Sequence, residues 1–242
     1  MPAFTGAADL GNNGGASISF TGSFPLPAGS NLLVAGILGA NVPTDDITSV
    51  AYGGSAMTLA AKLADDVSRE MYLYFLENPP TGTNNLVVTA GSAHYIYAVV
   101  GAWSGFAASG QPDVTNTHVG STTAVTNTFT TTQPNDWAIT MLEANGGTPA
   151  AASGLTLRVS SASIGLALLD SAGPLGASGL YSVTGASSPA ASDYLGQIAS
   201  AFIPFAGTPM TANLWVAGEV LPSIRKSAPH QLAFSGALQR DD

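Results

Sequence analysis

The β-rich character of this chain is plainest in EMYLYFLENPPTGTNNLVV, residues 70–88. Bulky side chains alternate with a period of two, which is typical of a β-strand: Met71, Leu73 and Phe75 on one face, and Tyr72, Tyr74 and Leu76 on the other. The following Asn78-Pro79-Pro80-Thr81-Gly82 combines the residues that turns require, and predicts a sharp reversal into a second strand at Leu86-Val87-Val88.

Short strands separated by turn residues extend on both sides of this segment. Ile18, Phe20 and Phe24 alternate with small polar residues and predict a half-buried strand, whereas the continuous apolar run Leu32–Leu38 predicts a strand covered on both faces. Gly53-Gly54 lies between two apolar runs and predicts a hairpin turn. Further candidate strands are His94–Trp103, Thr123–Thr131, Trp137–Leu142, Leu155–Val159, Ile164–Leu169, Leu180–Val183 and Gln197–Phe205. This spacing predicts a single antiparallel β-sandwich, jelly-roll-like, over residues 1–205.

One segment, Thr58–Glu70, allows two interpretations. Leu59, Leu63 and Val67 fit a helical period, but a strand through Leu63 followed by a loop at Asp65-Asp66 fits as well. No internal repeat is visible at the spacing of solenoids or propellers.

The composition favours a building block that packs against neighbours over a freely diffusing enzyme. Only 9% of the 242 residues are charged, against about 25% in ordinary soluble domains, while 45% are hydrophobic. The surface must therefore consist largely of Ser, Thr, Asn, Gly and Ala. The chain has no Cys, which excludes disulfides and thiolate metal sites.

Charge and hydropathy disfavour nucleic-acid and membrane partners. Residues 1–219 carry thirteen acidic and three basic residues, and this acidic body cannot neutralise phosphates. No apolar run approaches the ~20 residues of a membrane helix. The start, Met1-Pro2-Ala3-Phe4, lacks the features of a secretory signal, so we expect a soluble protein that is made inside a cell.

The pattern of strands decays after Phe205, and residues 206–242 predict an extended C-terminal arm that needs a surface to lie on. The alternative is a last edge strand followed by a disordered end. Three of the six basic residues lie in the last eighteen positions, in contrast to the acidic body. Aromatic and aliphatic anchors dominate interface energetics, so the predicted assembly residues are Leu214, Trp215, Val216, Leu221, Ile224, Arg225 and Lys226.

Residues with catalytic or metal-binding chemistry form no recognisable motif. There is no Gly-x-Ser-x-Gly and no His-Glu-x-x-His, and His94, His118 and His230 are far apart. Asp45-Asp46 and Asp65-Asp66 suit either Ca²⁺ or the capping of turns, and turns are the expected role. Glu70, Glu77 and Glu143 lie at strand ends, where we expect solvated positions and not a glycosidase pair. Trp103 and Trp137 continue the alternation of their strands and are expected in the core.

Residues 30–105 resemble a β-sandwich module of bacteriophage virion structural proteins. The resemblance rests on Leu32–Val34, on Ile47-Thr48-Ser49-Val50-Ala51-Tyr52-Gly53-Gly54 with Ala56-Met57-Thr58-Leu59, on Met71–Gly82 with Leu86–Thr89, and on Ala98–Gly105. It covers about a third of the chain and implies a part of a virion, such as a capsid decoration, a fibre or a tail component that contacts host glycans. It carries over no catalytic residue.

The sequence therefore predicts an all-β protein with a sandwich domain (residues 1–205) and an assembly arm (206–242). The expected function is non-enzymatic: a capsid decoration or cement protein of a virion, without cofactor or metal, forming a small cyclic homo-oligomer and binding a major capsid protein. The alternatives are a tail or fibre module that recognises host polysaccharide, and a hydrolase with two carboxylates facing each other across a groove.

Overall fold

The computed structural model describes residues 1–40, 45–64, 68–120, 123–161, 164–188, 191 and 195–206, and the backbone of 215–216 and 219–220. All regular structure in these residues is β-strand, and they contain no helix that could cross a membrane. The chain divides into two compact units, Met1–Phe205 and Ala206–Asp242. The strands are β1 (Ala3–Asn12), β2 (Ser17–Leu26), β3 (Leu32–Ala40), β4 (Ile47–Tyr52), β5 (Ser55–Ala56), β6 (Thr58–Ala64), β7 (Arg69–Glu77), β8 (Gly82–Ser104), β9 (Val114–Gly120), β10 (Ala124–Thr130), β11 (Trp137–Ala144), β12 (Pro149–Ala151), β13 (Thr156–Ser161), β14 (Leu166–Asp170), β15 (Leu180–Ser187), β16 (Leu195–Phe202), β17 (Trp215–Val216) and β18 (Glu219–Val220).

Strands β1 to β8 form one sandwich, whose two sheets are joined by the long strand β8. Residues 82–90 of β8 pair with β2 and β4, and β5 pairs with β4; we call these strands sheet I. Residues 95–104 of β8 pair with β1 and β3, and β7 and β6 follow; we call these strands sheet II. In the usual lettering of jelly-roll strands, sheet II has the order B-I-D-G with β6 added at its edge, and sheet I has the order C-H-E-F.

Strands β9 to β16 form a second sandwich with the same order of strands. Sheet III has the order β9-β16-β11-β14-β13, and sheet IV has the order β10-β15-β12. Here the strand that corresponds to β8 is divided into β15 and β16. The unit Met1–Phe205 therefore contains two jelly rolls in tandem.

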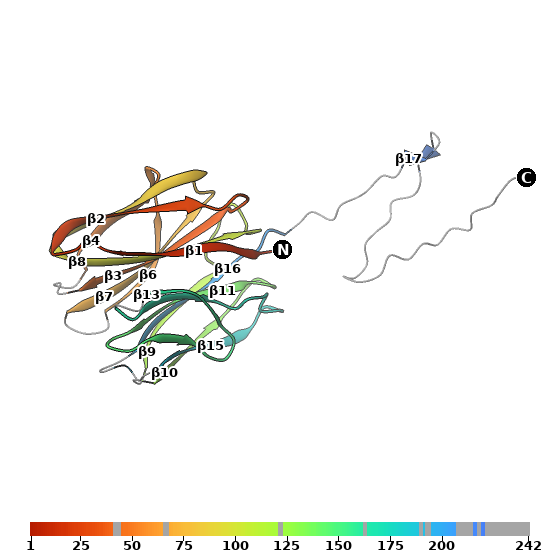
Figure 1. Cartoon of the computed structure of the whole chain (residues 1–242). Helices are drawn as coiled ribbons and strands as arrows, with labels where there is room; N and C mark the ends of the chain where they lie inside the picture. The colour runs from red at the N-terminus through yellow and green to blue at the C-terminus, as the bar shows by residue number, and fades with distance from the viewer. Residues whose placement is uncertain are drawn as a thin grey trace, which may run out of the picture. The chain divides into compact units, whose positions relative to one another are not determined.

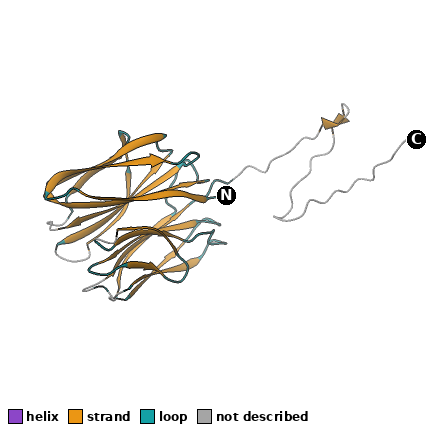
Figure 2. Ribbon diagram, in the orientation of Figure 1, coloured by secondary structure: helices purple, strands orange, loops and turns teal. Residues whose placement is uncertain are grey.

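The four sheets stack in the order I, II, III, IV, with a hydrophobic core between each neighbouring pair (Figures 1 and 2). Tyr52 and Leu86 of sheet I pack against sheet II in the first core. In the middle core, side chains of sheet II such as Leu73 and Trp103 meet sheet III. Sheets II and III are thus covered on both faces, which explains why β3, β7, β11 and β16 consist almost entirely of buried residues.

The prediction of an antiparallel, jelly-roll-like β-sandwich is confirmed, and its expected single sandwich is replaced by two. The apolar run Leu32–Leu38 is buried on both faces, and Gly53-Gly54 forms the hairpin turn between β4 and β5 with φ of 57° and 83°. Residues 58–64 form a strand, so the helical interpretation is wrong; Asp65, Asp66 and Val67 lie outside the described residues.

Ile18 was expected on the buried face of its strand, and this prediction is wrong. Phe20 and Phe24 are buried, but Ile18 is 56% exposed. The register of β2 against β8 shifts between Ser17 and Ser19, and such a bulge redirects the side chains that precede it.

The second unit, Ala206–Asp242, contains one described element. Trp215 pairs with Val220 and Val216 pairs with Glu219, so β17 and β18 form a short antiparallel hairpin.

Candidate functional site

The predicted assembly residues fall mostly outside the described part of the chain. Leu214, Leu221, Ile224, Arg225 and Lys226 lie outside it, and for Trp215 and Val216 only the backbone of β17 is described. The interface assigned to the arm therefore stays a prediction.

The described strands of the two outer sheets of the stack carry no charged side chains. No Asp, Glu, Lys or Arg occurs in β2, β4, β5 or residues 82–90 of β8, nor in β10, β12 or β15. Hydroxyl groups take their place. On sheet IV, Thr126 and Thr184 share a hydrogen bond of 3.0 Å, and Thr128 and Ser182 share one of 3.1 Å. The hydroxyls of this face thus satisfy one another across the strands.

A shallow polar cavity of about 400 Å³ lies at the hairpin end of the outer face of sheet I. Its lining is neutral: hydroxyl and amide groups, the hairpin glycines and one valine. The lining residues are Ser23, Gly53, Gly54, Thr83, Asn84, Asn85 and Val87. Asn84 donates through Nδ2 to the carbonyls of Pro80 and Thr81, which fixes one wall of the cavity. The groups of this cavity can exchange hydrogen bonds with a ligand but can neither transfer a proton near neutral pH nor bind a metal ion firmly.

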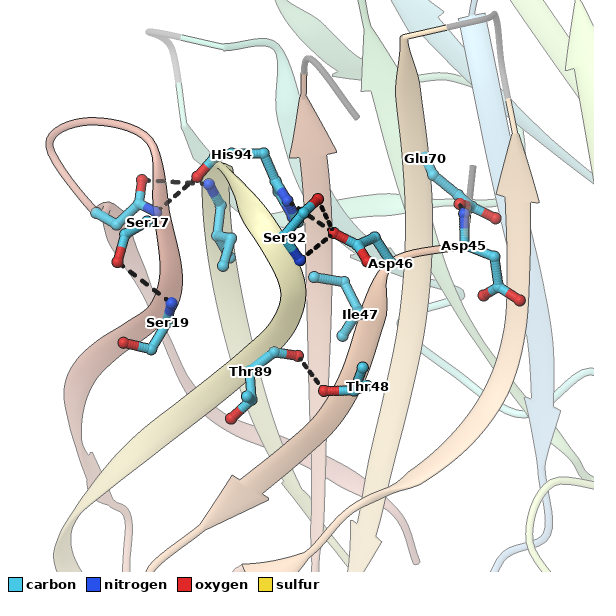
Figure 3. Close-up of polar contacts among 12 residues, drawn as sticks. Ser17, Ser19, Asp45, Asp46, Ile47, Thr48, Glu70, Thr89, Ser92 and His94 are labelled. Carbon is cyan, nitrogen blue, oxygen red and sulfur yellow. Dashed lines mark hydrogen bonds and ion pairs between the residues drawn. The ribbon is translucent and has the colours of Figure 1, made fainter. Parts of the chain in front are cut away.

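Asp46, Ser92 and His94 lie together at the corner where β8 passes from sheet I to sheet II (Figure 3). Asp46 Oδ2 accepts hydrogen bonds from the backbone N–H (2.7 Å) and the hydroxyl (2.5 Å) of Ser92, and His94 Nδ1 lies 3.3 Å from the same oxygen. The Ser92 hydroxyl, backed by its N–H and by the nearby His94, holds the pKa of Asp46 below its usual range. Asp46 thus caps backbone N–H groups, as the sequence predicted for this aspartate.

This trio contains the residue types of a catalytic triad but not its geometry. In a triad the histidine takes the proton of the serine and the carboxylate orients the histidine. Here the serine donates to the carboxylate, and His94 is 1% exposed, with no hydrogen-bond partner at either ring nitrogen among the described residues. The arrangement fastens the corner of β8 and offers no activated nucleophile.

Beside the corner, a buried glutamate organises the start of β4. Glu70 is 3% exposed; it accepts a hydrogen bond from the Tyr72 hydroxyl at 2.8 Å and another from the backbone N–H of Asp45, whose side chain pairs with Lys62. Burial and this hydrogen bond raise the pKa of Tyr72. The expectation that Glu70 is solvated is wrong, because the chain at Asp45 folds over it. Among the described residues no group of three or more His, Asp or Glu could hold a metal ion.

Two buried ion pairs lie in and beside the middle core. Arg69 Nη1 of sheet II lies 2.6 Å from Glu143 Oε1 of sheet III, and Glu143 is fully buried, which contradicts its expected solvated position. Glu143 is buried because β11 is covered on both faces. Asp170 of β14 is also fully buried; it pairs with Arg158 at 2.9 Å and accepts the indole N–H of Trp103 at 2.7 Å. Trp103 and Trp137 are buried, as predicted.

Asp113 and Asp136 form a carboxyl pair that no sequence pattern predicted. Asp136 immediately precedes β11 and is fully buried, and its carboxyl group lies close enough to that of Asp113, which precedes β9, for the two to interact electrostatically. Burial, together with the negative charge of Asp113, raises the pKa of Asp136 to about 8. Burial alone would raise the pKa of Asp113, but hydrogen bonds from the hydroxyl and backbone N–H of Thr132 lower it.

The carboxyl pair therefore shares one proton near neutral pH, with Asp136 neutral and Asp113 ionised. A hydrolase would need both carboxyls to face a groove. Asp136 has no exposed surface, so this pair lacks access to a substrate and acts within the fold.

Comparison of the chain with protein-family models, with curated proteins and with solved structures found no match.

Proposed function

We propose that this protein is a non-enzymatic structural protein of a bacteriophage virion, a decoration or cement protein that joins neighbouring capsid subunits. The observation that carries the proposal is the absence of charged side chains from the described strands that form both outer faces of the four-sheet stack. Charged residues are depleted at the centres of protein interfaces, because each charge that leaves water must be compensated. Two such faces at opposite ends of one rigid body suit a protein that is packed between others.

The body also suits a mechanical role. Three hydrophobic cores follow one another through the stack, and the ion pair between Arg69 and Glu143 links its two middle sheets. Jelly rolls are frequent in viral capsid and lectin domains, and this analogy of fold supports the proposed virion role. The resemblance of residues 30–105 to phage virion modules points the same way.

The arm supplies the proposed link to a neighbour. Burial of its apolar residues, among them Leu214 and Trp215, against another protein is favourable because it removes them from water. Binding of an extended segment to a sheet edge is a recurring mode of assembly. Arg225 and Lys226 are basic, whereas residues 1–219 carry a net charge of −10. Arg225 and Lys226 are thus complementary in charge to the acidic body of another copy in a small cyclic oligomer.

Lysine substitutions on the outer faces test the proposal. Thr21→Lys on sheet I and Thr126→Lys on sheet IV each place a charge on an exposed strand position without touching a core. We expect at least one of them to reduce co-sedimentation of the protein with capsids of the phage that encodes it by about tenfold or more, a loss of ~1.4 kcal/mol. Ser109→Lys, in the exposed segment between the jelly rolls, is the matched control. Unchanged binding of both face variants would contradict the proposal.

A second candidate function, recognition of a neutral saccharide of the host surface, is favoured by the cavity on sheet I. Hydroxyl and amide groups match the hydroxyls of a sugar, and the volume of about 400 Å³ is within the range of ligand sites. A glycan array containing neutral N-acetylglucosamine and galactose oligosaccharides, with sialyllactose as the acidic comparison, tests it. Binding of the neutral glycans that is lost in Asn85→Ala but kept in Ser182→Ala, on the opposite outer face, would support this candidate over the first.

A further inference from the structure

The two jelly rolls correspond strand by strand, apart from the short strand β5. In sheets II and III, β1, β8, β3, β7 and β6 stand in the same order as β9, β16, β11, β14 and β13. In sheets I and IV, β2, β8 and β4 stand in the same order as β10, β15 and β12. The order along the chain is also the same in both halves.

The correspondence extends to the register of individual residues. Val34 of β3 is flanked by Phe75 and Gly101, and Ile139 of β11 is flanked by Asp170 and Ser200. The same offset continues at the sheet edge, where Thr58 pairs with Phe75 and Thr156 pairs with Asp170. One alignment therefore holds across four neighbouring strands, although few of the aligned residues are identical.

A local irregularity of the backbone falls at the same aligned position in both halves. The register shifts between Leu59 and Ala61 in β6, and between Leu157 and Val159 in β13. The dipeptide Thr-Leu precedes both bulges, at residues 58–59 and 156–157. A bulge is a specific feature of a fold, and its repetition at one aligned position argues that the halves share an origin.

Most of the contacts between the halves are reciprocal. Strand β1 contacts β13, and its counterpart β9 contacts β6, the counterpart of β13. In the same way β8 contacts β13 and β14, while β16 contacts β6 and β7. Such exchange of partners defines an isologous interface, in which one surface pairs with a copy of itself around a twofold axis.

We infer that the two jelly rolls are diverged copies of one unit that paired with itself through sheet II, and that this chain is that dimer fused through residues 105–113. The face of sheet II that lines the middle core therefore fits, as its partner, a second copy of the same jelly roll. This inference does not depend on the proposed virion role.

The side chains of the middle core explain why a first jelly roll now pairs with a second jelly roll in preference to a copy of itself. We call this combination the unlike pair, and two copies of the same jelly roll a like pair. Sheet II presents apolar residues at the positions where sheet III has acids: Leu38 aligns with Glu143, and Phe75 aligns with Asp170. In the present pair, Arg69 lies beside Glu143 and the Trp103 indole donates to Asp170. In a pair of two second jelly rolls, both copies of Glu143 would be buried. Each would face Ile164, the residue that aligns with Arg69, and would lack the guanidinium that it meets in the present pair. Burying a carboxylate in this way costs several kcal/mol.

A pair of two first jelly rolls would bury no acid in this core, and the long Arg69 side chain, 27% exposed, can extend to water. Such a pair would lose the hydrogen bond between Trp103 and Asp170. The first jelly roll should thus pair with itself more weakly than with the second, and the second should not pair with itself.

Exchange between cut chains tests this order. A protease site is placed after the exposed Ser109 in the full chain, and the folded protein is cut. Cut protein with and without an isotope label is mixed, exposed briefly to urea, diluted and weighed by native mass spectrometry; uncut chain is the control that cannot exchange. We expect unlike pairs to predominate, pairs of first jelly rolls to be a minor species, and pairs of second jelly rolls to be absent. In Glu143→Leu, which installs the residue of the first half, pairs of two second jelly rolls should become detectable, at least about tenfold above the detection limit.

Any of three results would overturn the inference. The first is that only unlike pairs form, in the parent and in Glu143→Leu alike. The second is equal amounts of the two like pairs in the parent, and the third is cut halves that form no pair at all. The last counts against it because the inference makes each jelly roll a complete unit.

Discussion

Asp136 occupies in the second jelly roll the position that Asn31 occupies in the first, one residue before the aligned strands β11 and β3. The Asn31 amide donates to the carbonyl of Phe106 at 2.7 Å and accepts from its N–H at 3.2 Å. Asp136 instead lies beside the carboxylate of Asp113, whose negative charge, together with burial, favours the protonated form of Asp136. One half thus uses a neutral amide where the other uses a carboxyl group, and we expect this difference to make the stability of the second half depend on pH.

Asp136→Asn should remove this sensitivity. Folding raises the pKa of Asp136 from 3.8 to about 8. Between these two pH values the folded chain therefore holds a proton that the unfolded chain has released. The stabilising contribution is fully present below pH 4, decreases as the pH rises, and is lost by about pH 8. The free energy of unfolding should therefore fall by up to about 1.4 kcal/mol per pH unit in this window, and less steeply in the variant.

Urea unfolding between pH 4.5 and pH 8.5 measures this difference in slope. Asp9→Asn, at an exposed aspartate of β1, is the control and should keep the slope of the parent. An Asp136→Asn variant with the parent's pH dependence would show that the buried carboxyl is not the group responsible.

The ion pair between Arg69 and Glu143 should respond unequally to the loss of its two partners. Arg69→Leu removes the guanidinium from a carboxylate that is fully buried, and should cost about 3–5 kcal/mol of stability. Glu143→Leu leaves an arginine that is 27% exposed and can reach solvent, so its cost should stay near ~1 kcal/mol. Equal losses in denaturant unfolding at pH 7 would indicate that both charges are equally desolvated, contrary to the structure.

The neighbouring glycines of the β4–β5 turn should differ in their tolerance of alanine. Both have φ in the left-handed region, at 57° and 83°, which costs an L-residue about 1 kcal/mol. A Cβ at Gly53 would also lie 2.7 Å from Pro80 Cγ, whereas one at Gly54 would meet nothing within 4 Å. Gly53→Ala should therefore lower the midpoint of thermal unfolding clearly more than Gly54→Ala, and a reversed order would contradict the geometry of this turn.

The sequence predicted the strands well because their side chains obey simple periods. Alternation in residues 70–76 and the apolar run at Leu32–Leu38 are direct consequences of burial, and both appear in the structure as expected. It did not predict the duplication, because the aligned positions share burial and register but rarely identity. Leu38 and Glu143, for example, occupy one aligned position with opposite chemistry.

The polar groups were harder to predict than the strands. Glu70 and Glu143 were placed in solvent by their positions at strand ends, and only the packing of a further chain segment or sheet over them makes them buried. The pairing of Asp113 with Asp136 joins residues separated by the two strands β9 and β10, and no spacing rule connects them. Long-range contacts of this kind follow from topology, which the local pattern does not contain.

Sedimentation of the full chain against a chain ending at Ala206 tests most directly the claim that the protein is an assembly unit that acts through its arm. All three hydrophobic cores lie within Met1–Phe205, so the shortened chain should remain folded. The account predicts a defined oligomer for the full chain and a monomer for the shortened one. A full chain that sediments as a monomer, or an oligomer that survives removal of residues 207–242, would contradict it.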